Sequence, residues 1–406
     1  MKKIRTKFKE TEIRPIPEEW EIFKLEKLVD RVVDNRGKTP PLSKSGYELL
    51  EVNAIKTEKR LPDYSEVEKF VDNDTYINWF RAGHIQVGDI LIPTVGTIGS
   101  VAISLENRGS IAQNLIALRI NKRCEPLFLY YLLSAQQYRE QIHNLDIGGV
   151  QPSIKVPHLL NLDIVLPKIN EQKRIAEILG ALDEKIELNR RMNDTLEKIA
   201  NAVFKHWFVD FNFPNEQGKP YKSTGGKMID SELGLIPKGW RVGKLGEIIT
   251  LNYGKALKGE NRNDGNIKVY GSSGFVGFHN RKLVTGPGIV IGRKGNVGSV
   301  YWVDSDFYSI DTTYFVESKL PLVFCYYLLK NQNFINGDSV VPGLNREQAY
   351  LNQIILPDKI TIENFSNNSI ELRNRIAFIE KQNNILSQIR DSLLPRLMSG
   401  RIRINI

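Results

Sequence analysis

The 406-residue chain has little cysteine and no long apolar run. It contains two cysteines, Cys124 and Cys325, and no run of 18 apolar residues. Two cysteines supply neither a disulfide framework nor the four ligands of a structural zinc site. The apolar runs are too short to span a bilayer, and the first residues, MKKIRTKFKE, lack the pattern of a secretory signal. We therefore expect a soluble protein of the cytoplasm.

Motifs that would mark a catalytic centre are also missing. The sequence has no G-x-x-x-x-G-K-[ST] phosphate loop, no H-E-x-x-H motif and no G-x-G-x-x-G dinucleotide loop. The histidines are scattered without ligand spacing. The Pro40-Pro41 pair lacks the neighbouring amide or acid and the aromatic residue that an amino-methyltransferase would show. We expect no catalysis by this chain, no metal site and no cofactor bound to it.

Positive charge is in excess. Lysine and arginine number 56 against 47 acidic residues, which gives a net charge of +9. This balance favours an anionic partner, nucleic acid first, although many basic proteins bind no nucleic acid. The hydrophobic content of 41% supports sizeable cores, and the length allows two or three domains.

Apolar residues at helical spacing predict one long amphipathic helix from about Asn170 to Phe208. At 1.5 Å per residue its length would be roughly 55–60 Å. A second stretch, Ile370–Leu394, has the same character, so we expect the two helices to pack together. The predicted seam and partner-docking positions are Ile175, Leu182, Ile186, Leu196, Ile199, Ile376, Ile379, Leu386 and Leu393.

Three asparagines fall on or beside these apolar stripes: Asn189, Asn193 and Asn383. Buried polar residues in such a seam can fix the register of two helices at some cost in stability. Simple exposure to solvent is the alternative, and the sequence leaves both open.

The two halves of the chain repeat the same blocks in the same order. Ile16-Pro17 and Trp20 recur as Ile236-Pro237 and Trp240, and PLFLYYLL recurs as PLVFCYYLL. A glycine loop in the first half, TVGTIGSV, recurs as RKGNVGSV in the second. These matches indicate an internal duplication of roughly 190–220 residues. The first copy carries about 20 more residues, somewhere within Thr39–Gly83.

Within each copy, short β-branched runs alternate with turn signals, which is typical of a mixed α+β domain rich in loops. The expected strand runs are Ile90–Pro93, Ser110–Arg119, Ile289–Gly292 and Ser309–Val316. The stretch Val209–Asp230 is rich in proline and glycine and is interpreted as the linker between copies.

The glycine loops are the first candidates for DNA contact. Glycine allows positive φ and a close approach of the backbone. Arginine suits the guanine edge and asparagine the adenine edge, and both also contact phosphates. A turn that both copies need for folding is an alternative explanation of the glycines. For the variable residues between them we favour contact with DNA, because a shared frame with different side chains suits two readers of different sequences.

Other polar loops occupy equivalent places in the two copies. Each alone could be a solvated loop, but together they place amide, hydroxyl and basic side chains on matching loops. The candidate DNA-binding residues are Arg36, Lys38, Thr94, Thr97, Gln113, Asn114, Gln151, Lys258, Ser272, Ser273, Arg293, Lys294, Asn296, Asn345 and Arg346.

Taken together, these features resemble the specificity subunit of a type I restriction–modification enzyme, over essentially the whole chain. The resemblance is carried by Thr11-Glu12-Ile13 with Ile16-Pro17 and Trp20, by Leu166-Pro167 with Glu171-Gln172 and Ile175, by Phe204–Phe211, and by Glu232–Trp240. Two departures concern the packing of the helix starts. Arg14 stands where the second copy has Gly234, and the second copy has Asp358–Phe365 in place of Glu-Gln.

The resemblance implies two pseudo-symmetric α+β target-recognition domains separated by two long antiparallel helices that pack like a coiled coil. Residues 1–168 and 236–360 would be the domains, 169–209 and 361–406 the helices, and 210–235 the linker. Each domain would read one half of a split site in double-stranded DNA. The helices would set the spacing and dock two methyltransferase subunits.

In that family the methyltransferase subunits modify adenine with S-adenosylmethionine, and a restriction subunit driven by ATP, with Mg²⁺, completes the enzyme. Because the loops of the two copies differ, we expect an asymmetric site. The alternatives are a stand-alone DNA-binding protein and an adaptor that only assembles other proteins.

Overall fold

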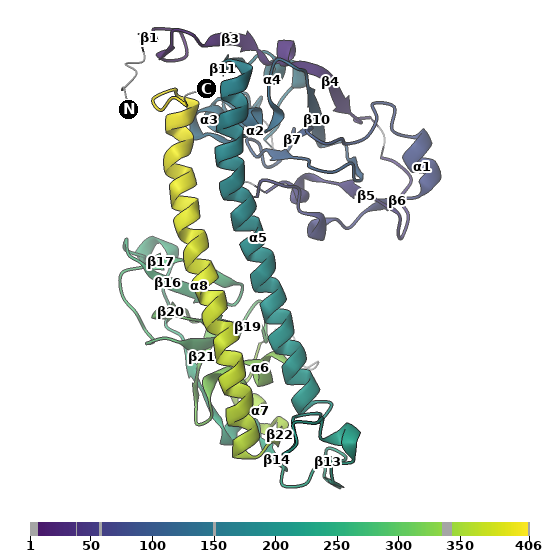
Figure 1. Cartoon of the computed structure of the whole chain (residues 1–406), viewed down its shortest axis with the longest axis vertical. Coiled ribbons are helices and arrows are strands. Elements are labelled where there is room, and N and C mark those ends of the chain that lie inside the picture. The colour runs from purple at the N-terminus through teal and green to yellow at the C-terminus, as the bar shows by residue number, and fades with distance from the viewer. Residues whose placement is uncertain (1–6, 38, 57–58, 149–151, 335–342, 405–406) are drawn as a thin grey trace. The chain divides into compact units, whose positions relative to one another are not determined.

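A computed structural model describes residues 7–37, 39–56, 59–148, 152–334 and 343–404 (Figure 1). The chain forms two compact units, Met1–Leu188 with Asn383–Ile406 (unit 1) and Asn189–Gln382 (unit 2). Each unit contains one globular domain and one half of each long helix, α5 (Ile169–Phe208) and α8 (Lys359–Met398). Among the described helices, none is long and apolar enough to cross a membrane.

The globular domain of unit 1, domain 1, is built on a main sheet in the order β4-β10-β7-β8 and a smaller sheet in the order β6-β5-β9. The main sheet consists of β4 (Val29–Asp34), β10 (Leu115–Ile120), β7 (Ile90–Pro93) and β8 (Ala102–Ile103), and the smaller sheet of β6 (Phe70–Val71), β5 (Tyr47–Leu50) and β9 (Ser110–Ile111). Two short pairs join β1 (Phe8–Lys9) to β2 (Ile16–Pro17) and β3 (Glu21–Lys24) to β11 (Asp163–Leu166). The helices are α1 (Asn73–Asn78), α2 (Pro126–Ser134), α3 (Gln136–His143) and α4 (Val156–Leu160), with 3-10 turns η1 (Leu25–Leu28), η2 (Val52–Ala54) and η3 (Tyr64–Glu66).

The globular domain of unit 2, domain 2, repeats this topology with sheets β15-β21-β18-β19 and β17-β16-β20. Their strands are β15 (Ile249–Tyr253), β21 (Thr313–Ser318), β18 (Gly288–Gly292), β19 (Val300–Val303), β17 (Gly274–His279), β16 (Ile267–Gly271) and β20 (Phe307–Ser309). The short pairs are β12 (Met228–Ile229) with β13 (Ile236–Pro237) and β14 (Arg241–Lys244) with β22 (Gln353–Leu356). The shorter helices are α6 (Leu322–Lys330) and α7 (Arg346–Leu351), with 3-10 turns η4 (Lys222–Thr224), η5 (Leu245–Glu247) and η6 (Gly259–Asn261).

Strand directions repeat as well, since β5 pairs with β9 in parallel and β16 pairs with β20 in parallel. The predicted duplication and the mixed α+β class are therefore confirmed.

The extra length of the first copy lies partly in one connection. Residues 51–69 join β5 to β6, whereas residues 272–273 join β16 to β17. Arg60 in this connection is 5% exposed and pairs with Glu187 of α5 at 3.0 Å. The longer connection therefore joins domain 1 to α5 through an ion pair.

Two predicted strand runs are broken in the structure. The run Ser110–Arg119 forms β9 and β10, which belong to different sheets, and the run Ser309–Val316 is divided in the same way between β20 and β21. The chain crosses from one sheet to the other through a turn in which the Leu115 amide donates to the carbonyl of Ala112 at 3.1 Å. Gln113 and Asn114 therefore lie at an exposed crossing and not inside a strand.

The second long helix begins earlier than the apolar stripe predicted, at Lys359. Asp358 precedes it, and its carboxylate accepts the Thr361 amide at 2.9 Å, as an N-cap does. The same carboxylate accepts the indole N–H of Trp240 at 3.1 Å. In unit 1 the indole of Trp20 donates instead to Glu171, at 3.3 Å. The missing Glu-Gln of the second copy is thus replaced by a carboxylate from the capping position.

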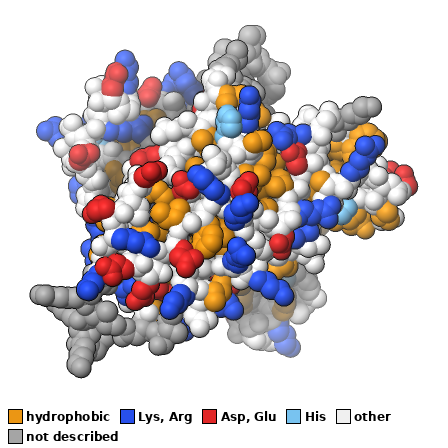
Figure 2. All heavy atoms as spheres, turned by 90° about the horizontal axis from the view of Figure 1, so that it is seen from above, with side chains coloured by type: hydrophobic (Ala, Val, Ile, Leu, Met, Phe, Trp, Pro, Cys, Tyr) orange, Lys and Arg blue, Asp and Glu red, His pale blue; other side chains and the backbone are white. Residues whose placement is uncertain are grey.

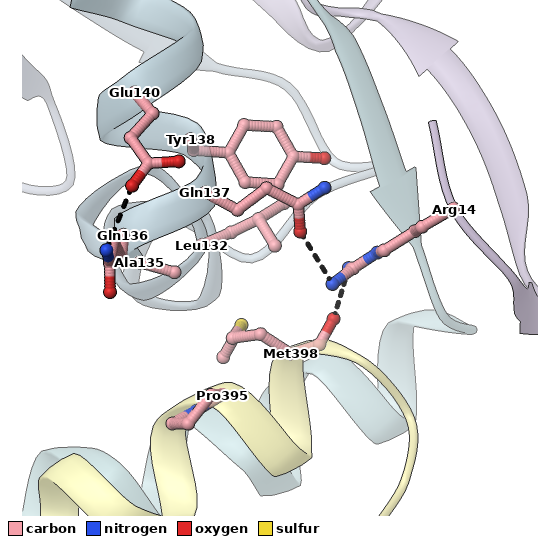
Figure 3. Close-up of a pocket in the computed structure, with 9 residues that line it drawn as sticks. All are labelled: Arg14, Leu132, Ala135, Gln136, Gln137, Tyr138, Glu140, Pro395 and Met398. Carbon is pink, nitrogen blue, oxygen red and sulfur yellow. Dashed lines mark hydrogen bonds between the residues drawn. The ribbon is translucent and has the colours of Figure 1, made fainter. Parts of the chain in front are cut away.

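Arg14 accounts for the other departure between the copies (Figure 3). Its guanidinium donates to the Gln137 side chain of α3 at 3.0 Å and to the carbonyl of Met398 at 2.6 Å. That carbonyl belongs to the last turn of α8, where backbone acceptors have no partner within the helix. Both long helices are also closed by the chain itself, because the Asn212 amide donates to the carbonyl of His206 at 2.9 Å and the Ile402 amide donates to that of Arg396 at 3.1 Å. Arg14 therefore adds a side-chain contact to the end of α8 that Gly234 cannot make.

The segment predicted as a linker is folded onto domain 2. The rings of Phe211 and Phe213 lie 5.8 Å and 4.8 Å from Trp240, and Tyr221 stacks on Phe213 at 4.7 Å. Aromatic burial therefore draws part of the predicted linker, residues 210–235, into the core of unit 2.

The seam between α5 and α8 contains most of the predicted positions. Four isoleucines are at most 4% exposed, namely Ile175, Ile186, Ile376 and Ile379. Four leucines are half-buried, namely Leu182, Leu196, Leu386 and Leu393. Ile199 is 45% exposed, so its assignment to the seam is corrected. The neighbouring Ala200, which is fully buried, takes the inward position on that turn.

The seam asparagines face inward. Asn189 is 1% exposed, and its amide donates to Gln382 at 2.8 Å. Asn193 donates to the carbonyl of Ile376 at 3.4 Å, and Asn383 donates to the carbonyl of Ile186 at 3.5 Å. Of the two alternatives, the structure supports a role in register. Later α5 residues meet earlier α8 residues within each unit, so the helix halves run antiparallel.

Each unit also buries an ion pair between the helices. Asp183 of α5 meets Arg390 of α8 at 2.7 Å in unit 1, and Glu197 of α5 meets Arg373 of α8 at 2.6 Å in unit 2. A tyrosine from the globular domain joins each carboxylate, Tyr131 at 2.6 Å and Tyr326 at 2.8 Å. The carboxylate therefore comes from α5 in both units and the guanidinium from α8.

Removing one partner of such a pair should destabilise the protein strongly. The Arg373 side chain is 7% exposed, so Glu197→Ala leaves a buried cation without its counter-ion. We expect a loss of about 3–5 kcal/mol in the free energy of unfolding, measured by chemical denaturation. Glu177→Ala is the control, because Glu177 is 59% exposed beside Arg174 and should cost less than about 1 kcal/mol. Equal effects of the two changes would contradict the structural role of the seam pair.

The Glu197 contribution should also depend on pH. Burial tends to raise the pKa of Glu197, but the hydrogen bond from Lys330 and the charge of Arg373 outweigh it and hold that pKa below its usual value. A lowered carboxyl pKa gives stability that is present above the unfolded pKa, about 4.3, and is lost as pH falls through the folded pKa. The difference in unfolding free energy between wild type and Glu197→Gln should therefore shrink below about pH 4. A difference that stays constant from pH 7 to pH 3 would rule this out.

Candidate nucleic-acid interface

The excess positive charge does not by itself mark an interface. On the face shown in Figure 2, Lys and Arg side chains are interspersed with Asp and Glu and with hydrophobic side chains. The candidate interface is therefore built from the loops that the sequence singled out.

The two glycine loops form the same turn. The Ile98 amide donates to the carbonyl of Gly96, and the Val297 amide donates to that of Gly295, both at 2.9 Å. The φ angles of Gly96 and Gly99 are 85° and 87°, and those of the matching glycines are 76° and 77°, a region that disfavours side chains. A Cβ at Gly99 would also lie 2.8 Å from His143. Turn geometry therefore accounts for the glycines, as the structural alternative proposed.

Each glycine loop is held between two other segments by backbone hydrogen bonds. In domain 1 the Thr94 amide donates to the carbonyl of Asn114 at 2.9 Å, and the Ile154 amide donates to the carbonyl of Thr94 at 3.0 Å. In domain 2 Arg293 takes the place of Thr94, bonded to Thr312 at 2.9 Å and Leu344 at 2.8 Å. The sheet crossing, the glycine loop and the segment before α4 or α7 therefore meet in both domains.

In domain 1 this meeting point is an open pocket of about 360 Å³. Its lining brings together four predicted residues, Arg36, Thr94, Gln113 and Asn114. Lys155 also lines it.

An adjacent pocket of about 710 Å³ shares Arg36 and is lined further by Asn78, Trp79 and Arg81. Trp79 is 37% exposed. Sequence reasoning missed these three residues, although the run Asn-Trp-Phe-Arg in the extra segment combines an aromatic with hydrogen-bonding side chains as nucleic-acid sites do.

Arg36 is held by a neighbouring carboxylate. Its Nε donates to Asp34 Oδ1 at 2.8 Å, and this hydrogen bond raises the pKa of Arg36. The ion pair orients the guanidinium at the boundary of the two pockets and partly offsets its charge.

One predicted contact is corrected, and a second predicted residue, which is exposed, also caps a helix. Thr94 is 2% exposed, and its hydroxyl donates to the carbonyl of Asn114 at 3.2 Å, so it supports the loop and cannot reach DNA. The Asn345 side chain accepts the amides of Glu347 and Gln348 at 2.9 Å and 3.2 Å, so it caps α7.

The other predicted residues are mostly accessible. Ser272 is half-buried, and its carbonyl accepts the Ser299 hydroxyl at 2.7 Å. Arg293 and Arg346 are half-buried, and the exposed ones are Arg36, Thr97, Gln113, Asn114, Lys258, Ser273, Lys294 and Asn296. Lys38 and Gln151 lie outside the described residues.

Domain 2 contains a cluster that the sequence did not reveal. The guanidinium carbons of Arg293 and Arg346 lie 4.9 Å and 5.3 Å from the ring centre of Tyr253, whose side chain is 50% exposed. Tyr253 ends β15 opposite Tyr314, and in domain 1 Asp34 ends β4 opposite Ile116. The same place in the frame thus holds an aromatic ring in one domain and a carboxylate in the other.

Residues suited to metal or thiol chemistry are not gathered in the part of the chain that the structure describes. There, no group of three His, Cys, Asp or Glu side chains could hold a metal ion. Both cysteines are buried, and burial raises the pKa of Cys325 to about 11, which disfavours the reactive thiolate.

A family model described as the type I restriction modification DNA specificity domain matches residues 17–198 and 237–374. The MjaIX specificity subunit of Methanocaldococcus jannaschii is 26% identical, with 98% of this chain and 97% of the relative covered. The HindI specificity subunit of Haemophilus influenzae is 23% identical over 68% of this chain and 77% of its own.

A crystal structure of a type I restriction–modification S subunit from M. genitalium has the same fold, with a TM-score of 0.56 and 20% identity. It covers 95% of this chain and 96% of its own. The names of these relatives agree with the expectation of a DNA-specificity component without its own catalytic role. The chain belongs to the family of DNA specificity subunits of type I restriction–modification systems.

Proposed function

We propose that this chain reads a split, asymmetric DNA site, with domain 1 reading one half and domain 2 the other. One observation carries the proposal: the same backbone frame presents different side chains in the two domains. At matching places domain 1 has Thr94 and Gln113-Asn114, where domain 2 has Arg293 and Asp311-Thr312. Base edges are distinguished by the donor and acceptor pattern of such side chains, so unlike sets read unlike bases.

The helix pair would fix the separation of the two halves. Half-site spacing on DNA follows from the distance between the reading elements. The seam combines buried ion pairs with the Asn189–Gln382 hydrogen bond, and both resist sliding of one helix along the other.

The helices also expose apolar side chains at equivalent positions of the two units, where partner subunits could dock. In unit 1 these are Leu188 and Ile389, which are 52% and 42% exposed, and in unit 2 they are Phe378 and Ile199, 56% and 45% exposed. Leu188 matches Phe378 in the duplication, and Ile199 matches Ile389. Repeated exposed apolar positions fit the docking of two copies of one methyltransferase subunit.

The partner subunits would supply the chemistry. In this proposal the methyltransferase subunits use S-adenosylmethionine, a restriction subunit uses ATP and Mg²⁺, and this chain binds none of them. Since the proposed DNA partner lies inside the cell, we propose a cytoplasmic location.

The proposal is tested by mapping methylated adenine across the genome of the source cell, with and without this gene. We expect a single motif to lose its methylation, in two unlike halves separated by unspecified bases. A palindromic motif would contradict asymmetric reading by unlike domains.

A second experiment purifies the chain from the source cell through a tag. We expect a methyltransferase to co-purify with it. If the chain purifies alone and binds DNA sequence-specifically, a stand-alone DNA-binding protein is favoured.

The one-domain, one-half arrangement predicts separable effects. Gln113→Ala with Asn114→Ala removes two exposed side chains of domain 1 and should relax base preference in one half, by about 1–3 kcal/mol per lost base contact. The other half should be unchanged in the same methylation map. Glu106→Ala is the control, because Glu106 is an exposed residue of domain 1 outside the pocket lining. Unchanged preference in both halves would indicate an adaptor.

A further inference from the structure

We propose that Tyr253 is a platform that orients Arg293 and Arg346 to read guanine in the half-site of domain 2. This inference rests on the proposed function and extends it to a specific base and to a residue that no sequence motif marks.

The two arginines come from different parts of the chain. Arg293 begins the glycine loop and Arg346 begins α7, yet both guanidinium groups lie on the ring of Tyr253, 4.9 Å and 5.3 Å from its centre. Arg293 also lies 5.8 Å from the ring of Tyr314. Tyr314 is 1% exposed and donates its hydroxyl to the carbonyl of Leu344 at 3.1 Å, so the platform is anchored in the core.

Each guanidinium keeps a two-donor edge available. Arg293 uses Nη1 on the carbonyl of Asp311 at 3.0 Å, and Arg346 uses Nε on the carboxylate of Glu347 at 3.2 Å. Among the described residues, no other hydrogen bond engages either group. The remaining edges, Nε–Nη2 of Arg293 and Nη1–Nη2 of Arg346, have the geometry of a fork.

A fork of fixed orientation matches two acceptors that lie side by side. Guanine presents O6 and N7 in this way in the major groove, and a bidentate arginine matches both. An arginine fork also fits phosphate, but the exposed Lys294 of the same loop can supply the positive charge for a phosphate contact, which leaves the two forks for bases. Stacking on an aromatic face fixes the guanidinium plane, which lysine cannot reproduce.

Domain 1 lacks the tyrosine platform and its arginine pair. Its equivalent of Tyr253 is Asp34, which pairs with Arg36, and its equivalent of Arg293 is the buried Thr94. The guanidinium pair on an exposed ring is therefore a feature of the domain 2 half of the frame, and the guanine preference should be confined to one half-site.

The test uses the complex purified from the source cell through a tag on this chain, with selection from random duplex DNA. Wild type should prefer guanine at one or two positions of one half by about 10- to 100-fold. Arg293→Lys and Arg346→Lys keep the charge but remove the fork, so each should lose that preference while the other half and the salt dependence stay unchanged. Tyr253→Ala should behave like the lysine variants, and Tyr253→Phe like wild type.

The DNA can also be changed. Replacing those guanines with 7-deazaguanine, which lacks the N7 acceptor, should weaken DNA binding by the wild-type complex and leave binding by the lysine variants unaffected.

Arg241→Lys is the matched control, since Arg241 lies in another sheet and pairs with Glu247 at 2.9 Å. The guanine assignment fails if the lysine variants keep the preference. It also fails if the alanine variants of the two arginines weaken binding equally for all sequences and reduce the salt slope by about 1, which is the signature of a phosphate contact. Changes in both halves at once would instead overturn the one-domain, one-half proposal, so the two failures are distinguishable.

Discussion

Charge of opposite sign buried between α5 and α8 is the constraint on which the rest of the structure depends. Asp183 and Glu197 both belong to α5, and their partners Arg390 and Arg373 both belong to α8. Pairing of α5 with another α5 would bury carboxylate against carboxylate, and pairing of α8 with another α8 would bury two arginines. A buried ion pair adds little net stability over apolar residues, but losing one partner is costly. The arrangement therefore selects which helix pairs with which more than it strengthens the pair.

The same carboxylates tie the globular domains to the helices. Tyr131 of α2 donates to Asp183, and both Tyr326 and Tyr327 of α6, the latter being the repeat equivalent of Tyr131, donate to Glu197, so each domain contributes hydroxyls to the ion pair of its own unit. This explains why PLFLYYLL and PLVFCYYLL recur in the sequence. The tyrosines lie where the helix of the domain meets the seam. A change in helix register would displace the tyrosine contact in the same unit.

The sequence predicted the duplication, the α+β class and the long helices because these follow from periodicity and repeated blocks. Contacts between distant residues were beyond its reach. Glu171 in the first turn of α5 and Asp358 just before α8 hold equivalent indoles from unequal positions, which no alignment of the two copies would match. Thr94 was expected at the surface because it stands in a loop, but its place between two backbone partners buries it. The role proposed for Tyr253 could not be predicted from the sequence, because it depends on two arginines from distant parts of the chain that contact its ring.

In the glycine loops, the interactions that hold the backbone are distinct from the side chains that are candidates for reading DNA. In each glycine loop the backbone is fixed by positive φ angles and by hydrogen bonds between main-chain atoms, none of which depends on the side chains presented. Thr97 and Asn296 occupy the same exposed place in the turn, although one is a hydroxyl and the other an amide. Substitution there changes the donors and acceptors offered to a base at little cost in stability, since exposed loop positions away from caps and cores tolerate change. A duplicated frame of this kind can therefore hold two different specificities on one architecture, which an asymmetric site requires.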